Sequence, residues 1–294
     1  MRWKQITLAG VGLLGGSLGL AIKRRGLARR VVGFVRRHAS LTECRKYGAV
    51  DYATLDLLEA VADADLVVLC TPIAQMRLLL QNMRTALSPG TIITDVGSVK
   101  GSVVSDLEGL AAKAGAHFVG SHPMAGAEKT GVAAARANLF VNAVCVLTPT
   151  RKTNRKALGR VEALWKAAGA RILRLSPGEH DKLVSRSSHL PHLVAAQLAS
   201  LVLQPDAPRT QALLCANGFR DTTRIASSSP EMWRDIALAN RRNLTASMDT
   251  FIGQLRSLRE VLRHGDGEAL QRFFSEAKQR RDKWSKHSAS SSPE

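Results

Sequence analysis

Cysteines and long apolar runs are scarce in this chain of 294 residues. Its four cysteines, Cys44, Cys70, Cys145 and Cys215, are scattered without the spacing of a metal-binding motif. No apolar run approaches the roughly 20 residues of a membrane-spanning helix, and the N-terminal residues lack the apolar core of a signal peptide. We therefore expect a cytoplasmic protein with reduced cysteines, no metal site and no membrane partner.

Acidic and aromatic residues are also few. The chain has 42 Lys and Arg against 24 Asp and Glu, a formal net charge of +18, and only 4% aromatic residues. A positive field favours anionic ligands and also binds nucleic acid without sequence preference. Because no helix-turn-helix, zinc-finger or RNA-binding signature accompanies the charge, we expect an enzyme acting on small molecules, with no specific nucleic-acid partner.

The most informative stretch is a glycine-rich turn between a predicted strand at 6–9 and a predicted helix. Gly10, Gly12 and Gly15 fit the pattern G-x-G-x-x-G. In a dinucleotide-binding fold, the first glycine permits the tight turn, the second admits a pyrophosphate to the backbone, and the third lets helix and strand pack closely. The helix that follows directs free N–H groups and its positive dipole end at the phosphates. The alternative, a merely flexible turn, does not explain the flanking strand and helix.

An acidic residue is missing where an NAD site usually has one. About 20 residues after the glycines, at the end of the second strand, Asp or Glu commonly binds the ribose 2′-OH. Here Val35 holds that place and is followed by Arg36 and Arg37. Without a carboxylate to repel a 2′-phosphate, and with two guanidinium groups to pair with it, the site is predicted to prefer NADP over NAD. The alternative is that both arginines are solvated surface charges.

Predicted strands and helices alternate as far as residue 175. The strands are expected at 6–9, 31–35, 65–72, 91–95, 117–120, 142–147 and 172–175. This alternation predicts the α/β class, with a Rossmann-type doubly wound sheet in a dinucleotide-binding domain of residues 1–175. Ligands of such sheets bind at the carboxyl ends of the strands.

After residue 175 the sequence shows only helical patterns. They predict an all-helical substrate and dimerisation domain at residues 176–286, followed by a disordered tail at 287–294. The pattern over 179–204 is one long helix interrupted only by Pro191. Its stretch 190–203 is largely apolar, more than a small domain covers by itself. We therefore expect a homodimer formed by the helical domain.

Two polar residues at predicted strand ends are candidates for catalysis. His122 follows the strand at 117–120 and would face the nicotinamide, where it takes a proton from an alcohol as hydride leaves. Ser98 is placed to orient that histidine. On local sequence alone, His122 can equally belong to a structural turn and Ser98 can equally be a helix N-cap.

The helical domain adds three candidates. His189 and His192 are three residues apart and can share one helix face, but no Glu or Cys accompanies them, so we expect no metal there. Arg224 stands beside the apolar Ile225 and Ala226, which suggests a guanidinium held for an anion. The alternative for Arg224 is an ion pair with Asp221.

Taken together, these segments resemble the prephenate/arogenate dehydrogenase family of tyrosine biosynthesis, from Gln5 to about residue 285. The matching segments are Gly10–Leu18, Thr71–Pro72, Asp95–Lys100, Gly120–Glu128, Ser188–His192, Asp221–Ala226 and Pro230–Arg234. Several motifs in the right order are more specific than any one of them. The resemblance implies a Rossmann domain followed by a helical dimerisation domain.

The resemblance also implies roles for individual residues. His122 matches the catalytic histidine and Ser98 the serine that assists it. The substrate site would comprise Arg224, which matches the carboxylate-binding arginine, together with His192, His189, Glu128 and Trp233. The cofactor, NADP by preference or NAD, would be bound by Gly10, Gly12, Leu13, Leu14, Gly15, Arg36, Arg37, Thr71 and Pro72.

The reaction implied is oxidative decarboxylation of a cyclohexadiene, giving 4-hydroxyphenylpyruvate from prephenate or tyrosine from arogenate. Two other interpretations stay open at this point. One is another two-domain NAD(P)-dependent hydroxyacid dehydrogenase. The other is a non-catalytic protein that senses NADP or binds nucleic acid, against which the set of His122, Ser98 and Arg224 argues.

Overall fold

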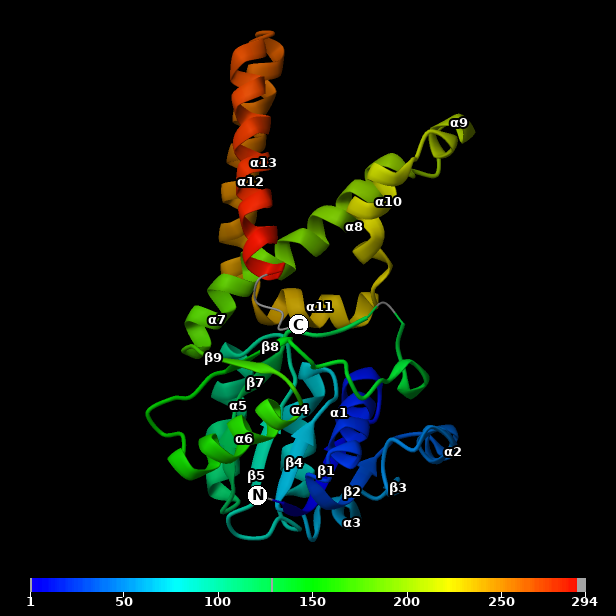
Figure 1. Cartoon of the computed structure of the whole chain (residues 1–294), viewed down its shortest axis with the longest axis vertical. Coiled ribbons are helices and arrows are strands. Elements are labelled where there is room, and N and C mark those ends of the chain that lie inside the picture. Colours follow the sequence, from blue (N-terminus) through cyan, green and yellow to red (C-terminus); the bar gives the residue numbers. More distant parts are fainter. Residues whose placement is uncertain (1, 128, 290–294) are drawn as a thin grey trace. The chain divides into compact units, whose positions relative to one another are not determined.

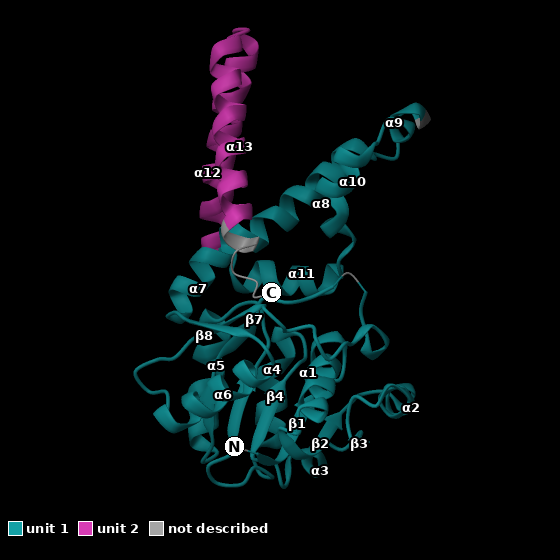
Figure 2. Ribbon diagram, viewed as in Figure 1, with its two compact units in different colours: residues 1–241 teal, residues 242–294 magenta. Residues whose placement is uncertain are grey.

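The computed structural model of the chain describes residues 2–127 and 129–289. The chain divides into two units, residues 1–241 and 242–294, which Figure 2 shows in different colours. The first unit holds every strand of the described residues and most of the helices, and the second consists of two long helices.

A six-stranded parallel sheet with helices on both sides forms the centre of the first unit (Figure 1). Its strands lie in the order β3-β2-β1-β4-β5-β6. They are β1 (Trp3–Ala9), β2 (Ala28–Phe34), β3 (Tyr52–Thr54), β4 (Leu66–Leu69), β5 (Ile92–Asp95) and β6 (His117–Val119). Because the strand order reverses between β1 and β4, a crevice for a ligand is expected at the carboxyl ends of these two strands.

Apolar side chains cover both faces of this sheet. In β4, Leu66 and Val68 belong to one buried cluster and Val67 and Leu69 to the other, as alternation along a strand requires. The covering helices are α1 (Leu13–Arg24), α2 (His38–Tyr47), α3 (Leu57–Val61), α4 (Ile73–Met83), α5 (Gly101–Lys113) and α6 (Arg155–Ala167). The predicted Rossmann-type fold is therefore confirmed.

A second, three-stranded sheet was not predicted. It consists of β7 (Ser121–Pro123), β8 (Val144–Leu147) and β9 (Arg171–Arg174), with β7 antiparallel to β8 and β8 parallel to β9. The sequence analysis assigned β8 and β9 to the main sheet, which is wrong. The chain leaves that sheet at Gly120, where a Cβ atom would come within 2.5 Å of the Thr148 hydroxyl. This turn places His122 opposite Val146 at the carboxyl edge of the main sheet.

After β9 the described residues form only helices, as expected. These are α7 (Pro177–Val184), a π-helical turn η2 (Ser185–His189), α8 (Leu190–Val202), α9 (Arg209–Leu213), α10 (Asn217–Thr223), the 3₁₀ turn η3 (Arg224–Ser227) and α11 (Pro230–Ala239). Ser176 and Glu179 form a capping box at the start of α7. The π turn coincides with the place where Pro191 lacks the N–H that an α-helix would use.

The second unit contains α12 (Arg241–Arg263) and α13 (Gly267–Ala289), joined by a tight turn in which Gly265 has a φ of +66°. Large apolar side chains stay exposed on both helices: Met248, Ile252, Leu255, Leu262, Phe273, Phe274 and Trp284. Helix α13 continues through residues 287–289 of the predicted disordered tail, and the rest of that tail lies outside the described residues.

Candidate active site

The glycine-rich turn has the geometry that a dinucleotide-binding site requires. Gly10 has a φ of +101°, which a residue with a side chain rarely adopts. A Cβ atom on Gly15 would lie 2.0 Å from the Gly10 carbonyl oxygen, so this helix position must stay bare. Gly12, the residue before α1, has nothing within 4 Å of its Cβ position. The N-terminus of α1 is thus open to an anionic group.

A cavity of about 510 Å³ opens beside this turn. Its lining includes Gly10, Gly12, Arg36, Arg37, Thr71 and Pro72, all of which the sequence analysis proposed. The Thr71 hydroxyl is buried and has no hydrogen-bond partner among the described residues. A buried hydroxyl without a partner is costly, and a ribose or phosphate oxygen of a bound dinucleotide would satisfy it.

The other proposed cofactor residues contribute differently. Leu13 and Leu14 do not line this cavity, because their side chains pack against the apolar cluster beneath α1. Their place in the first turn still leaves their backbone N–H groups near the open helix end. Val35 is 5% exposed and follows β2, and it lines the cavity together with the two arginines. No carboxylate therefore stands at the end of β2.

His122 is buried and is held by a chain of polar contacts. Its Nδ1 lies 2.8 Å from Nε2 of His180, and Nδ1 of His180 lies 2.8 Å from a carboxylate oxygen of Asp181. The Asp181 carboxylate also accepts hydrogen bonds from the backbone N–H groups of Lys100, at 2.7 Å, and Gly101, at 2.8 Å. This chain links β7, α7 and the start of α5.

The chain of contacts fixes which nitrogen of each ring carries a proton. A carboxylate only accepts hydrogen bonds, so His180 donates from Nδ1 to Asp181 and accepts at Nε2. His122 must then donate from Nδ1, which leaves its Nε2 unprotonated in the neutral ring. Burial lowers the pKa of His122 well below its ordinary value, and the neighbouring His180 and Lys100 lower it further. His122 is therefore a neutral imidazole with Nε2 as its acceptor.

A second buried network supports the strand that carries His122. Lys100 forms a fully buried ion pair with Asp95 at the end of β5, and its ammonium group also donates to the Ser121 carbonyl at 2.8 Å. The Ser121 N–H donates to Asp95 at 3.1 Å, and the Trp165 indole N–H donates to the Ser121 hydroxyl at 3.1 Å. These contacts connect β7 to the end of β5 and fix the position of the backbone next to His122.

His122 forms part of the wall of a second cavity, of about 890 Å³. The polar and aromatic residues that line it come from distant segments: Ser98, His122, Lys129, Arg136, Ser188, His192, Arg224, Ser228 and Trp233. The rings of His192 and Trp233 stack with centroids 3.6 Å apart, and the His192 ring also contacts the Ser188 carbonyl at 2.9 Å. The Trp233 indole nitrogen is buried without a hydrogen-bond partner among the described residues. Five of the predicted residues thus meet in one cavity.

For three predicted site residues, the structure does not show the predicted contact or position. No hydrogen bond joins the Ser98 side chain to His122 in the described residues, and Nδ1 of that ring contacts His180 instead. His189 does not line the cavity. It is fully buried behind it, bonded to Asn240 at 3.1 Å, and burial lowers its pKa to about 4. Glu128 lies outside the described residues.

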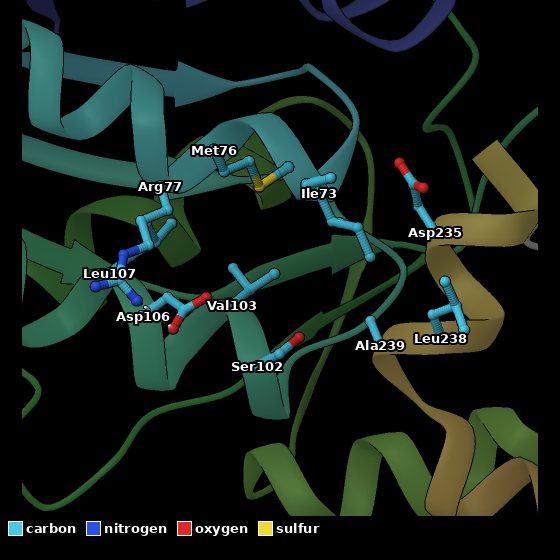
Figure 3. Close-up of a pocket in the computed structure, with 11 residues that line it drawn as sticks. Ile73, Met76, Arg77, Ser102, Val103, Asp106, Leu107, Asp235, Leu238 and Ala239 are labelled. Atoms are coloured by element: carbon cyan, nitrogen blue, oxygen red, sulfur yellow. Dashed lines mark hydrogen bonds and ion pairs between the residues drawn. The ribbon is translucent and has the colours of Figure 1, made fainter. Parts of the chain in front are cut away.

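A third cavity, of about 350 Å³, lies between α4, α5 and α11 (Figure 3). Its charged groups are engaged in ion pairs, since Arg77 contacts Asp106 at 3.3 Å and Asp235 contacts Arg234 at 2.7 Å. Its remaining lining is mainly apolar, and none of the predicted site residues belongs to it. The redox site is therefore assigned to the two cavities that flank the glycine-rich turn and His122.

The sequence analysis missed His180, Asp181 and Lys100. His180 and Asp181 are adjacent polar residues in the first turns of a helix, a position that usually faces solvent, and nothing local indicates that they are buried. Lys100 lies in the matched segment Asp95–Lys100, but the segment does not indicate that its side chain is fully buried in an ion pair with Asp95. Only the tertiary contacts identify these residues as part of the site.

The described residues contain neither a metal-binding cluster nor a membrane-spanning helix. No group of three or more His, Cys, Asp or Glu side chains is arranged to hold a metal ion. No helix in this part of the chain has the length and apolar composition needed to cross a membrane.

Comparison with known proteins agrees with the fold. Residues 18–174 match the nucleotide-binding domain of prephenate dehydrogenase, and residues 176–276 match its dimerization domain. Prephenate dehydrogenase of Bacillus subtilis (strain 168) is 40% identical over 283 residues, which are 94% of this chain and 75% of that protein.

Two solved structures are similar over nearly their whole length. Prephenate dehydrogenase from A. aeolicus, in complex with hydroxyphenyl propionate and NAD⁺, has a TM-score of 0.90 at 33% identity and covers 96% of this chain and 99% of its own. Synechocystis arogenate dehydrogenase has a TM-score of 0.80 at 32% identity and covers 95% and 99%. The protein therefore belongs to the prephenate dehydrogenase family.

Proposed function

We propose that this protein catalyses the oxidative decarboxylation of prephenate, arogenate or both in tyrosine biosynthesis, with NADP or NAD as the hydride acceptor. The observation that carries the proposal is His122. It is a buried neutral imidazole whose Nδ1 is engaged by His180 and whose ring lines the 890 Å³ cavity. The family relatives named prephenate dehydrogenase and arogenate dehydrogenase support the same reaction.

His122 acts as the general base in this proposal. The bound dinucleotide supplies the ring that accepts hydride from the substrate carbon bearing the 4-hydroxyl. Nε2 of His122 takes the hydroxyl proton, and His180 with Asp181 holds the imidazole in the tautomer that leaves Nε2 free. The substrate's ring carboxylate leaves as CO₂, and aromatisation drives its departure.

The substrate is held by residues on the opposite wall of the cavity. Arg224 binds a carboxylate of the substrate, and the stacked pair of His192 and Trp233 contacts the ring. The indole N–H of Trp233, which has no partner in the described residues, donates to an oxygen of the ligand. Fixing the ring relative to His122 in this way lowers the entropic cost of reaching the transition state. Ser98 lines the same cavity and contacts the substrate rather than Nδ1 of His122.

The cofactor preferred is NADP. Arg36 and Arg37 line the nucleotide cavity and are exposed, and Val35 stands at the end of β2 where an acidic residue would bind the ribose. The carboxylate in the cavity lining is that of Glu43 in α2, not one at the strand end. A guanidinium in this place binds a 2′-phosphate through charge-assisted hydrogen bonds. Comparing kcat/KM for NADP and NAD tests this preference, and a higher value with NAD would reject it.

The protein works as a homodimer in this proposal, with residues 1–175 binding the dinucleotide and residues 176–286 binding the substrate and the second copy. The match to a dimerization domain and the exposed apolar side chains of α12 and α13 support the assembly. The four unpaired cysteines agree with the reducing cytoplasm as its location.

One assay separates this function from that of another hydroxyacid dehydrogenase. Purified protein is given prephenate, arogenate or a simple 3-hydroxy acid, each with NADP and with NAD, and reduced cofactor is measured by absorbance. We expect turnover with prephenate or arogenate and none with the simple hydroxy acid. Reduction of cofactor by the simple hydroxy acid alone would reject the proposal.

A further inference from the structure

The segment Lys129–Arg136, here called the partition loop, lies between the two cavities of the site. Gly131 and Val132 line the nucleotide cavity, whereas Ala133, Ala134 and Arg136 line the cavity of His122. A dinucleotide that extends from Arg36 and Arg37 to His122 must therefore pass along this loop.

The loop is fixed to the helix that faces the phosphates. The backbone N–H of Arg136 donates to the hydroxyl of Ser17 in α1 at 3.0 Å, and Ser17 is fully buried. Val132 is buried in the apolar cluster beneath the loop. A Cβ atom on Gly16 would come within 2.9 Å of Ala135, so a bare glycine is what lets the loop lie against α1. The starting point of the Arg136 side chain is thus well defined.

The charge of the His122 cavity indicates what Arg136 is for. Three cationic side chains line it, those of Lys129, Arg136 and Arg224, and no Asp or Glu belongs to its lining among the described residues. The planar guanidinium of arginine suits bidentate binding of carboxylate and phosphate groups. Here Arg136 is exposed on the cavity wall that α1 supports, so an anionic ligand is the counter-ion that fits.

We propose that Arg136 is a further specificity-determining residue that binds an oxyanion of a ligand in the His122 cavity. The inference rests on the proposed function, because both ligands of that function carry such groups. The substrate has carboxylates, of which Arg224 takes one, and the dinucleotide has phosphates beside the N-terminus of α1. The chemistry is the same in both cases, a guanidinium donating to a carboxylate or phosphate oxygen.

The test compares Arg136→Gln with Arg136→Lys and with Arg151→Gln. Arg151 is an exposed arginine in a turn that lines none of the three cavities, so its variant controls for the loss of one positive charge. Equilibrium dissociation constants are measured from the change in tryptophan fluorescence on ligand binding. The ligands are NADP, adenosine 2′,5′-bisphosphate, which represents the adenosine half of NADP, and 3-(4-hydroxyphenyl)propionate. The KM for prephenate is measured in parallel.

We expect Arg136→Gln to raise the dissociation constant of one of the two ligands by about tenfold or more. Arg136→Lys should partly restore the affinity, and Arg151→Gln should leave it unchanged. A rise in the KM for prephenate and in the dissociation constant of 3-(4-hydroxyphenyl)propionate assigns the oxyanion to the substrate. A rise for NADP, with the adenosine half unaffected, assigns it to the nicotinamide-side phosphate.

Unchanged constants for both ligands in a folded Arg136→Gln protein overturn the inference. A lowered melting temperature without recovery in Arg136→Lys also overturns it, because it makes the residue structural. Absence of turnover with both prephenate and arogenate in the unmodified protein would instead reject the proposed function. The equilibrium constants would still decide the role of Arg136 in that case.

Discussion

The two cavities of the site differ in how the sequence specifies them. The nucleotide cavity comes mainly from one local unit, in which β1, the glycine-rich turn, α1 and the end of β2 follow each other within the first 37 residues. The His122 cavity takes residues from Ser98 to Trp233, which meet only in the folded chain. A site built from backbone geometry is visible in a motif, whereas a site built from side-chain contacts depends on the whole fold.

The difference extends to how each cavity binds its ligand. In the nucleotide cavity the main groups are bare glycines and an open helix end, so most of the binding falls to the backbone. In the His122 cavity the working groups are side chains, and the imidazole of His122 is itself oriented by the His180 side chain. We therefore expect single substitutions to have larger effects in the His122 cavity, and the following variants test that expectation.

The largest effect is expected from His122→Asn. Removing the general base should lower kcat by about 10²–10⁴-fold while leaving the dissociation constant for the dinucleotide nearly unchanged. Stopped-flow measurement of reduced cofactor, with cofactor binding measured separately, checks both. A kcat close to that of the unmodified protein would falsify the assignment of His122 as the base.

His180→Asn should have the next largest effect, because it removes the group that orients the imidazole of His122. Misplacing a catalytic group costs about 10²-fold. The pH profile gives a second measurement. In the unmodified protein burial keeps the pKa of His122 low, so the acid limb of kcat should lie below pH of about 6.5, the ordinary histidine value.

Loss of His180 removes one of the neighbours that lower the pKa of His122 and admits water, and both changes raise that pKa, so the acid limb should move to higher pH. His264→Asn, an exposed histidine in the turn before α13, is the matched control and should leave kcat and the profile unchanged. A lower kcat with an unmoved acid limb would mean that His180 does not act through the ionisation of His122.

Arg224→Ala should act on binding rather than on chemistry. Loss of a charge-assisted hydrogen bond to the substrate carboxylate costs about 1.5–3 kcal/mol, which corresponds to a rise in KM of about 10- to 150-fold. Arg241→Ala, an arginine outside the lining of the cavity, serves as the control. An unchanged KM in a folded Arg224→Ala protein would remove Arg224 from the substrate site.

The smallest effect is expected in the nucleotide cavity, from Val35→Asp. The new carboxylate repels a 2′-phosphate and can bond a ribose 2′-OH, so the ratio of kcat/KM for NADP to that for NAD should fall by about tenfold. Steady-state kinetics with both cofactors measure the ratio. An unchanged ratio would mean that the end of β2 does not contact the 2′-phosphate or 2′-hydroxyl of the ribose.

Local patterns predicted five of the six strands of the main sheet, without the three-residue β3, and the residues at the glycine-rich turn of the nucleotide cavity. Gly10, Gly12 and Gly15 are defined by backbone needs that any neighbouring sequence would impose. The small second sheet was missed because β7 is only three residues long and its departure from the main sheet depends on the space beside Gly120. Strand periodicity cannot distinguish which of two sheets a short strand joins.

The sequence analysis named Ser98 and not His180 as the residue that orients His122, for a similar reason. Ser98 was nearer in the predicted order of strand ends, and it does line the same cavity. The contact to Nδ1 comes instead from His180, whose place depends on how α7 packs against α5 through the bonds from Lys100 and Gly101 to Asp181. Such packing of a helix from the later part of the chain is not encoded in any local pattern.

The most direct test of the central claim is the stoichiometry of the reaction in one assay. Prephenate labelled in the ring carboxylate is incubated with the protein and NADP, and labelled CO₂ and NADPH are measured together. The proposed function predicts one CO₂ for each NADPH, both dependent on His122. NADPH formed without CO₂, or CO₂ released at the same rate by His122→Asn, would contradict it.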